Sequence, residues 1–292
     1  MVKEQEHQIS VYRVLKILGV SRSGYYSYKQ RKMSNQEINR KEIKKQILIE
    51  YEESKQIYGA PKIQEKLNKK GFNVSKRTVG VYMRQMDIKA CYRTKKTRTT
   101  INSNFSKKLI NEVNRIFNPS RPNKIWVTDI TYIWTSYDKF VYLTTVLDLY
   151  SRKVISWDLS YTLEVDSVVK CIEEAKKSRT IDKPLIVHSD RGVQFVSKAY
   201  TSLFEVNMRP SYSKKGDPWD NAVIESFFST IKREWLSRFT ILNYHHAKAL
   251  IFEYIETFYN TKRIHGSIEY MTPNELELGY KLSNTARLSL KA

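Results

Sequence analysis

The chain has 292 residues, 41% of them hydrophobic, which is enough for one large globular domain and one or two small ones. Its formal charge of +21 favours a polyanionic partner, and nucleic acid is the most common one. A membrane surface is the weaker alternative, because the basic residues are spread along the chain and do not line one amphipathic helix. No run approaches the ~18 apolar residues of a membrane helix, and the start has no apolar signal-peptide core, so we expect a cytoplasmic, DNA-associated protein. The two cysteines lack the spacing of a metal-binding pair, so we expect no structural zinc site.

Residues 1–56 are predicted to form an N-terminal helical segment. Apolar residues at helical spacing indicate two short helices over 9–31, in which Gly19 ends the first helix and Ser21 caps the second. A polar helix is expected over 34–56. The first pair is a weak signal for a helix-turn-helix, because it is so short.

Residues 57–100 give a clearer helix-turn-helix pattern and are predicted to be a DNA-binding domain. Pro61 suits a first helical turn, Gly71 ends that helix, and Ser75 caps the next one. Basic side chains on the second helix are predicted to face outward, where a recognition helix meets DNA: Lys76, Arg77 and Arg84. A plain solvated helical hairpin is the alternative.

A basic linker is expected over 101–122. The stretch 89–108 that leads into it has seven Lys or Arg and no acid, and it has little apolar periodicity. Lys95 and Lys96 are therefore predicted to follow the phosphate backbone of DNA.

Residues 123–240 are predicted to be an α/β catalytic domain with a mixed sheet, followed by a C-terminal helical extension over 241–292. Runs of β-branched and aromatic residues predict strands over 124–134, 139–150, 153–160 and 184–190. Helices are expected over 164–178, 197–206, 219–236 and 243–260.

Three acids are candidate metal ligands. Asp129 lies in the middle of a predicted strand, where an acid needs an explanation, and Asp190 closes the apolar strand LIVHS. Glu225 shares one face of the 219–236 helix with Asn221 and Lys232, four residues before it and seven after it. Phosphodiester transfer by two Mg²⁺ ions needs such oxygen ligands, and Lys232 could hold the DNA strand being joined.

Other acids of this domain are predicted to have structural and not catalytic roles. Asp148 is expected to open a turn toward Arg152, and Asp158 also lies near a strand. On the 219–236 helix, Asp220 is interpreted as a residue that favours the helix dipole and Glu234 as a solvated charge.

Four ordered motifs resemble one protein family over nearly the whole chain. They are IYGAPKIQEKLNKKGFNVSKRTV (57–79), WVTDITYI (126–133), HSDRGVQF with SKKGDPWDNAVIESFFSTIKRE (188–195 and 213–234), and YNTKRIHGSIEYMTPNEL (259–276). The sequence is similar to bacterial insertion-sequence transposases of the IS-three family, orfB type, whose core is similar to retroviral integrase.

The resemblance implies a ribonuclease-H-like fold, a five-stranded mixed sheet flanked by helices. It implies that the family's three acids fall on Asp129, Asp190 and Glu225, and its basic residue on Lys232. His188, Asn221 and His265 occupy motif positions and are candidate site neighbours, with a structural hydrogen bond as the alternative. Lys214 and Lys215 are candidate DNA contacts in the motif before Glu225.

The predicted function is metal-dependent cleavage and strand transfer of DNA, with two Mg²⁺ or Mn²⁺ ions per site. The expected partners are element ends and target DNA, further copies of the chain, and an upstream-frame product, because no leucine-zipper heptads are present here. A nuclease that cuts without joining and a non-catalytic DNA-binding regulator are the alternatives.

Overall fold

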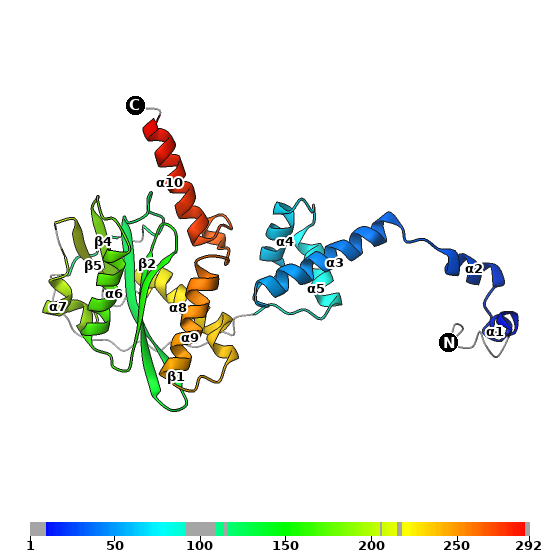
Figure 1. Cartoon of the computed structure of the whole chain (residues 1–292), viewed down its shortest axis with the longest axis horizontal. Coiled ribbons are helices and arrows are strands. Elements are labelled where there is room, and N and C mark those ends of the chain that lie inside the picture. Colours follow the sequence, from blue (N-terminus) through cyan, green and yellow to red (C-terminus); the bar gives the residue numbers. More distant parts are fainter. Residues whose placement is uncertain (1–9, 92–108, 114–115, 205, 215–217, 290–292) are drawn as a thin grey trace.

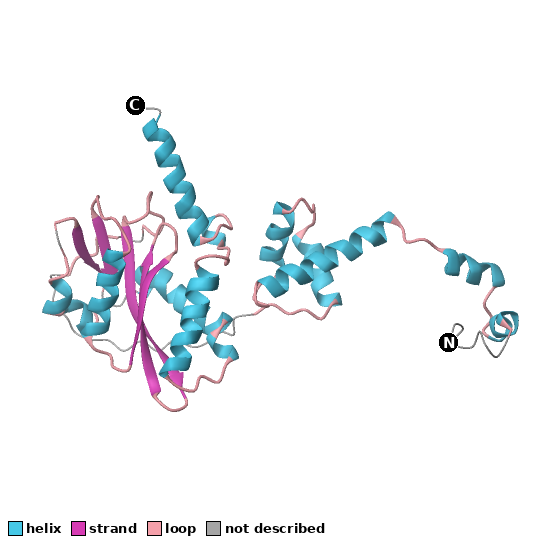
Figure 2. Ribbon diagram, in the orientation of Figure 1, coloured by secondary structure: helices cyan, strands magenta, loops and turns pink. Residues whose placement is uncertain are grey.

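The computed structural model describes residues 10–91, 109–113, 116–204, 206–214 and 218–289, which form a helical region and an α/β core (Figures 1 and 2). The helical region comprises α1 (Val11–Ile17), α2 (Arg22–Gln30), α3 (Asn35–Glu53), α4 (Ala60–Lys69) and α5 (Lys76–Gln85). The core comprises β1 (Ile125–Thr135), β2 (Lys139–Asp148), β3 (Val154–Ser160), α6 (Val165–Lys177), β4 (Leu185–Ser189), α7 (Lys198–Thr201), β5 (Met208–Tyr212), α8 (Ala222–Glu234), α9 (Tyr244–Tyr254) and α10 (Pro273–Ser289).

The predicted helix ends of the N-terminal region are confirmed. Gly19 and Gly71 adopt left-handed backbone angles, with φ of +65° and +87°, directly after α1 and α4. The hydroxyls of Ser21 and Ser75 each accept a hydrogen bond of 3.1 Å from the backbone N–H three residues further on. These caps satisfy N–H groups that the first helical turn leaves without partners.

Helix α3 packs with α4 and α5 into one small unit. Ile43 and Ile47 of α3 are buried in the same cluster as Ile63, Leu67 and Val79 of the other two helices. The polar helix expected over 34–56 is therefore part of the body that presents α5. In Figure 1, α1 and α2 lie farther out, at the end of the molecule opposite the core.

The core contains a five-stranded sheet with the order β3-β2-β1-β4-β5, which confirms the ribonuclease-H-like fold. Strands β1, β2 and β3 are antiparallel neighbours, whereas β4 and β5 run parallel to β1. The sequence does not predict strand β5, because its five residues include Arg209 and Pro210 and show no alternation of apolar and polar residues. Within sheets, proline is typical of an edge strand, and β5 lies at the edge. The helix expected over 197–206 is limited to the single turn of α7.

The two faces of the sheet are covered by different helices. Trp126 and Val187 point to the face that packs with α6. Val127 and Leu143 point to the other face, where α8 and α9 pack. Successive side chains of a strand point to opposite faces, so the position of a residue along β1 or β4 decides which helices it meets.

Glu234 corrects the sequence-based interpretation, because it is a buried ion-pair partner and not a solvated charge. The residue is only 4% exposed. Arg263 donates to both of its carboxylate oxygens, at 2.6 and 2.7 Å, and Tyr254 donates a third hydrogen bond at 2.8 Å. The two-pronged pairing fixes the end of α8 to the segment that follows α9.

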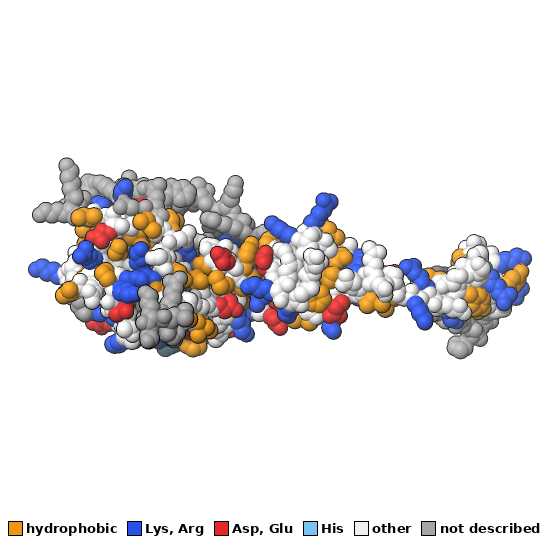
Figure 3. Space-filling view, turned by 90° about the horizontal axis from the view of Figure 1, so that it is seen from above, with side chains coloured by type: hydrophobic (Ala, Val, Ile, Leu, Met, Phe, Trp, Pro, Cys, Tyr) orange, Lys and Arg blue, Asp and Glu red, His pale blue; other side chains and the backbone are white. Residues whose placement is uncertain are grey.

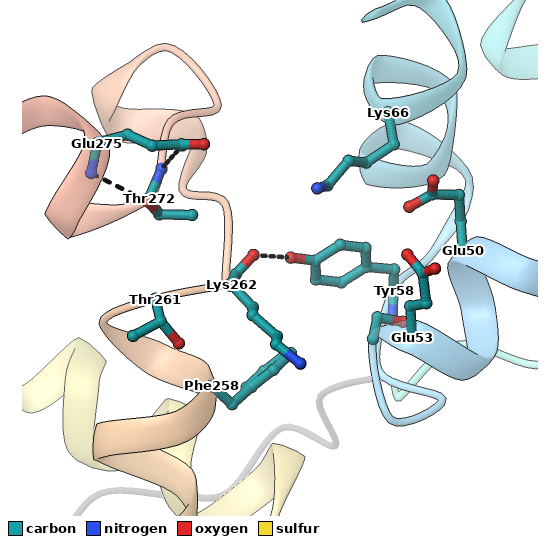
Figure 4. Close-up of a pocket in the computed structure, with 10 residues that line it drawn as sticks. Glu50, Glu53, Tyr58, Lys66, Phe258, Thr261, Lys262, Thr272 and Glu275 are labelled. Carbon is teal, nitrogen blue, oxygen red and sulfur yellow. Dashed lines mark hydrogen bonds between the residues drawn. The ribbon is translucent and has the colours of Figure 1, made fainter. Parts of the chain in front are cut away.

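Tyr58 connects the helical unit to the core (Figure 4). Its buried hydroxyl donates to the carbonyl oxygen of Lys262, at 3.0 Å, and accepts from the N–H of Ile264, at 2.9 Å. Beside it lies a cleft of about 410 Å³ lined by acidic and basic side chains, including Glu50, Lys66, Lys262 and Glu275. Among the described residues, no helix has both the length and the apolar character needed to cross a membrane.

Candidate active site

Two aspartates from neighbouring strands lie on the same face of the sheet. β1 and β4 are parallel, and Val127 pairs with His188. Two residues further along this register, Asp129 lies beside Asp190, which directly follows the end of β4. Both have the orientation of Val127, so their side chains face the side covered by α8.

Helix α8 brings a third acid to this side. Its residues Ile224, Phe227 and Ile231 are buried in the core beneath β1, and Glu225 is half-buried. The negative charge of Glu225 raises the pKa of Asp129, so the two carboxyl groups lie within electrostatic range. The structure therefore places the three predicted acids on one side of the sheet.

The pKa values of the two aspartates are both raised. Burial raises the pKa of Asp129 well above its usual range, and the negative charge of Asp190 is the next largest cause. Burial also raises the pKa of Asp190. Each carboxylate accepts one backbone hydrogen bond of 2.8 Å, Asp129 from Ile130 and Asp190 from Gly192, and these bonds partly offset the effect.

The carboxylate oxygens of the three acids suit a hard divalent cation, but their present positions do not form a complete coordination sphere. Within the described ranges, no group of three Asp, Glu, His or Cys side chains is arranged to hold a metal ion. Like charges keep such carboxylates apart, and a cation between them would remove that repulsion. Because Mg²⁺ keeps several waters and needs only a few carboxylates, small side-chain movements of the acids would complete a site.

Lys232 lies beside the acids at the edge of β1. Its Nζ donates to the hydroxyl of Thr131, at 2.7 Å, and lies 4.5 Å from the centre of the Tyr132 ring. Its positive charge lowers the pKa of Asp129. β4 pairs with β1 only as far as Val127, so this part of the edge remains accessible to Lys232.

The three candidate site neighbours differ in their surroundings. His188 is buried, with Nδ1 2.9 Å from the hydroxyl of Ser211, and burial lowers its pKa to about 4, so it is neutral at pH 7. Asn221 is buried immediately before α8. His265 lines a different cavity, of about 270 Å³, with Arg263; none of the three acids is among the described residues that line it.

The described candidate DNA contacts lie on the surface. Lys76 and Arg77 are exposed at the start of α5, Arg84 is exposed in its last turn, and Lys214 is exposed after β5. Basic side chains are visible on both the core and the helical region (Figure 3). Lys95, Lys96 and Lys215 lie outside the described residues.

The remaining acids of the core have internal partners. Asp148 accepts backbone hydrogen bonds from Asn123 and Tyr150, at 2.7 and 2.8 Å, which confirms its role in the turn. Asp158 pairs with Lys170, and Asp220 accepts from the N–H of Lys214 and from a neighbouring amide. These contacts identify structural carboxylates, in contrast to the Asp129–Asp190 pair.

Gly192 is a site residue that the sequence reasoning did not single out. A Cβ atom at this position would lie 3.0 Å from the Asp190 carboxylate and 3.1 Å from the Gln194 amide oxygen. Only glycine fits here without displacing that carboxylate. Its position two residues after Asp190, within the HSDRGVQF motif, is the signal that could have revealed it.

Comparison with known proteins agrees with the fold. Family models described as "Integrase core domain" match residues 119–218 and 206–273, and an "HTH-like domain" model matches 37–96. The transposase of element IS904 from Lactococcus lactis is 35% identical over 85% of this chain and 98% of its own length. The IS3A transposase InsF of Escherichia coli is 31% identical over 94% and 96%, respectively, and a 31 kDa protein of IS600 from Shigella sonnei is 32% identical over 88% and 94%.

The integrase-type core and the transposase relatives define a polynucleotidyl transferase of the DDE class, which cuts and joins DNA strands. The similarity to insertion-sequence transposases extends over both the helical unit and the core. The chain belongs to the IS3 family of transposases.

Replacing Gly192 by alanine should displace the Asp190 carboxylate while leaving the fold intact. The contact requires the carboxylate to move by only a few tenths of an ångström. Misplacing a reacting group by about 1 Å can reduce a rate by about 100-fold, so we expect cleavage of element-end DNA to fall by less than that factor. The thermal midpoint should stay close to that of the unmodified protein. Gly279→Ala, which meets no atom within 4 Å, is the matched control. Full activity in Gly192→Ala would show that the carboxylate position is not critical.

Asp129→Asn should stabilise the metal-free protein at neutral pH. The pKa of Asp129 is higher in the folded than in the unfolded chain, so the folded state binds more protons over the window between these two values. The free energy of unfolding therefore falls as pH rises through that window. The asparagine variant does not show this fall, because asparagine does not titrate. Thermal unfolding in EDTA should show a higher midpoint for the variant at pH 7.5, and a difference that shrinks toward pH 4.

The control for this measurement is Asp87→Asn, because the Asp87 side chain is 90% exposed. Its unfolding midpoint should follow that of the unmodified protein across the pH range. A metal-free Asp129→Asn protein that is no more stable than the unmodified protein at pH 7.5 would contradict the electrostatic account of the site.

Proposed function

We propose that Asp129, Asp190 and Glu225 hold two divalent metal ions, Mg²⁺ or Mn²⁺, and that the site so formed cuts the ends of the insertion sequence and joins them to target DNA. The observation that carries the proposal is the side-by-side position of the two aspartates, with a pKa of Asp129 raised by both other acids. Oxygen ligands alone suit these hard cations. When bound, such ions would activate the nucleophile and neutralise charge on the attacking and leaving oxygens.

The residues around the acids have distinct proposed tasks. Asp190 is held by the N–H of Gly192, so that its second oxygen can face a cation. Lys232 would bind a phosphate of the strand that carries the reacting 3′-hydroxyl, because it reaches the surface edge of β1 beside Asp129. Water first attacks to free that hydroxyl, and the hydroxyl then attacks a second phosphodiester. No covalent protein–DNA intermediate is needed.

The helical unit is the proposed DNA-recognition part. Its exposed Lys76, Arg77 and Arg84 lie on α5, the second helix of the helix-turn-helix, which is the helix that enters the major groove in such domains. The basic stretch that includes Lys95 and Lys96 would follow the phosphate backbone. We further propose that several copies act together on DNA and that an upstream-frame product contributes to end recognition.

Asp190→Asn should abolish metal-dependent cleavage of element-end DNA while leaving DNA binding largely intact. The amide keeps the size of the side chain but removes a negative ligand. Cleavage is measured on labelled element ends in Mg²⁺, and binding is measured on the same DNA in EDTA. Asp158→Asn, which alters an acid paired with Lys170, should retain cleavage. Cleavage by Asp190→Asn at the unmodified rate would remove the proposed mechanism.

A strand-transfer assay with pre-nicked ends separates transposition from simple nuclease activity. The unmodified protein should join the exposed 3′-hydroxyl to target DNA, whereas a nuclease would give cleavage products only. A regulator would bind its site equally well with or without chelator and give no product. The fold, the acids and the transposase relatives favour joining.

A further inference from the structure

A row of exposed aromatic rings runs along the β1–β2 hairpin, starting beside Lys232. It consists of Tyr132, Phe140 and Trp134, whose exposed fractions are 61%, 45% and 54%. The neighbours Ile133 and Thr135 are buried on the α8 side, so alternation along β1 turns the aromatic rings to the opposite face of the sheet from Asp129. We call these three residues the aromatic row.

The rings brace one another. Trp134 and Phe140 are directly paired across the two strands, with ring centres 4.9 Å apart. Phe140 also meets Tyr132, at 5.4 Å, and both contacts are edge-to-face. Such aromatic pairs are favourable, so the row is an ordered surface and not a set of independently moving side chains.

A lysine lies at each end of the aromatic row. Lys232 Nζ is 4.5 Å from the centre of the Tyr132 ring, and Lys139 Nζ is 5.5 Å from that of Trp134. Lys232 also contacts Thr131, two residues after Asp129 on the same strand. Lys232 therefore contacts residues of both faces at the open edge of β1. A strand that leaves the acids and passes over this edge to the other face would meet a cation, then aromatic rings, then a second cation.

The combination of three aromatic rings and two flanking lysines favours a nucleic-acid partner over an apolar protein partner. Three large aromatic side chains left exposed together indicate an interaction site. An apolar partner would bury both lysines without a counter-charge, which is costly. Unpaired DNA offers flat bases for the rings and phosphates for the lysines, and single-strand binding proteins combine these two features.

We propose that the aromatic row stacks unpaired bases of the DNA strand at the acid site, with Lys232 and Lys139 on its phosphates. The inference rests on the proposed function, since that function supplies cut strand ends whose bases can unpair. The ligand class is single-stranded DNA of any sequence, because every base has a face that can stack.

The test measures binding of a short fluorescein-labelled oligothymidine to the full chain by anisotropy, in EDTA so that no cleavage occurs. Loss of one stacking ring weakens single-strand binding by roughly 5- to 150-fold. Trp134→Ala should show a loss in this range, whereas Trp134→Phe should retain most of the affinity. Phe252→Ala removes an aromatic residue that is 55% exposed on α9, away from the row, and should bind like the unmodified protein.

Equal single-strand affinity of Trp134→Ala and the unmodified protein would overturn the inference. If that variant also sediments as a smaller species, the row is instead a contact between copies of the chain. Neither result depends on catalysis, so failure of the aromatic row is distinguishable from failure of the acid site, which Asp190→Asn reports.

Discussion

The structure of the core depends on one unfavourable arrangement, the burial of two carboxylates side by side. Asp129 and Asp190 share a face of the sheet because β1 and β4 are parallel and in a register that pairs Val127 with His188. Burial raises the pKa of both carboxyl groups, and the negative charge of Asp190 raises the pKa of Asp129 further. Such a pair persists only where the rest of the fold holds it in place, and this is typical of a functional site.

The surroundings of the acids provide that rigidity. The sheet fixes the two aspartates, and α8 is fixed at its far end by the buried pairing of Glu234 with Arg263. Tyr58 then connects the helical unit to the segment that carries Arg263. The proposed DNA-recognition helix and the proposed cutting site are thus linked through hydrogen bonds to one short stretch of chain.

The sequence predicts the parts of this arrangement that are local, and misses those that depend on pairing across the chain. The strands that contain Asp129 and Asp190 follow from β-branched and aromatic runs, and the turn at Asp148 follows from its neighbours. The burial of Glu234 depends on Arg263, 29 residues further along the chain, so its position on the helix alone does not reveal the ion pair. The short edge strand β5 contains Pro210 and lacks alternation. The exposure of Trp134 depends on which part of the sheet the helices leave uncovered, and the strand sequence does not show this.

The most direct test of the central claim is to locate metal ions by anomalous X-ray diffraction in crystals of the full chain soaked with Mn²⁺. The account predicts two manganese peaks about 3.5–4 Å apart, ligated by Asp129, Asp190 and Glu225. Manganese bound elsewhere, with these three carboxylates left unligated, would contradict it.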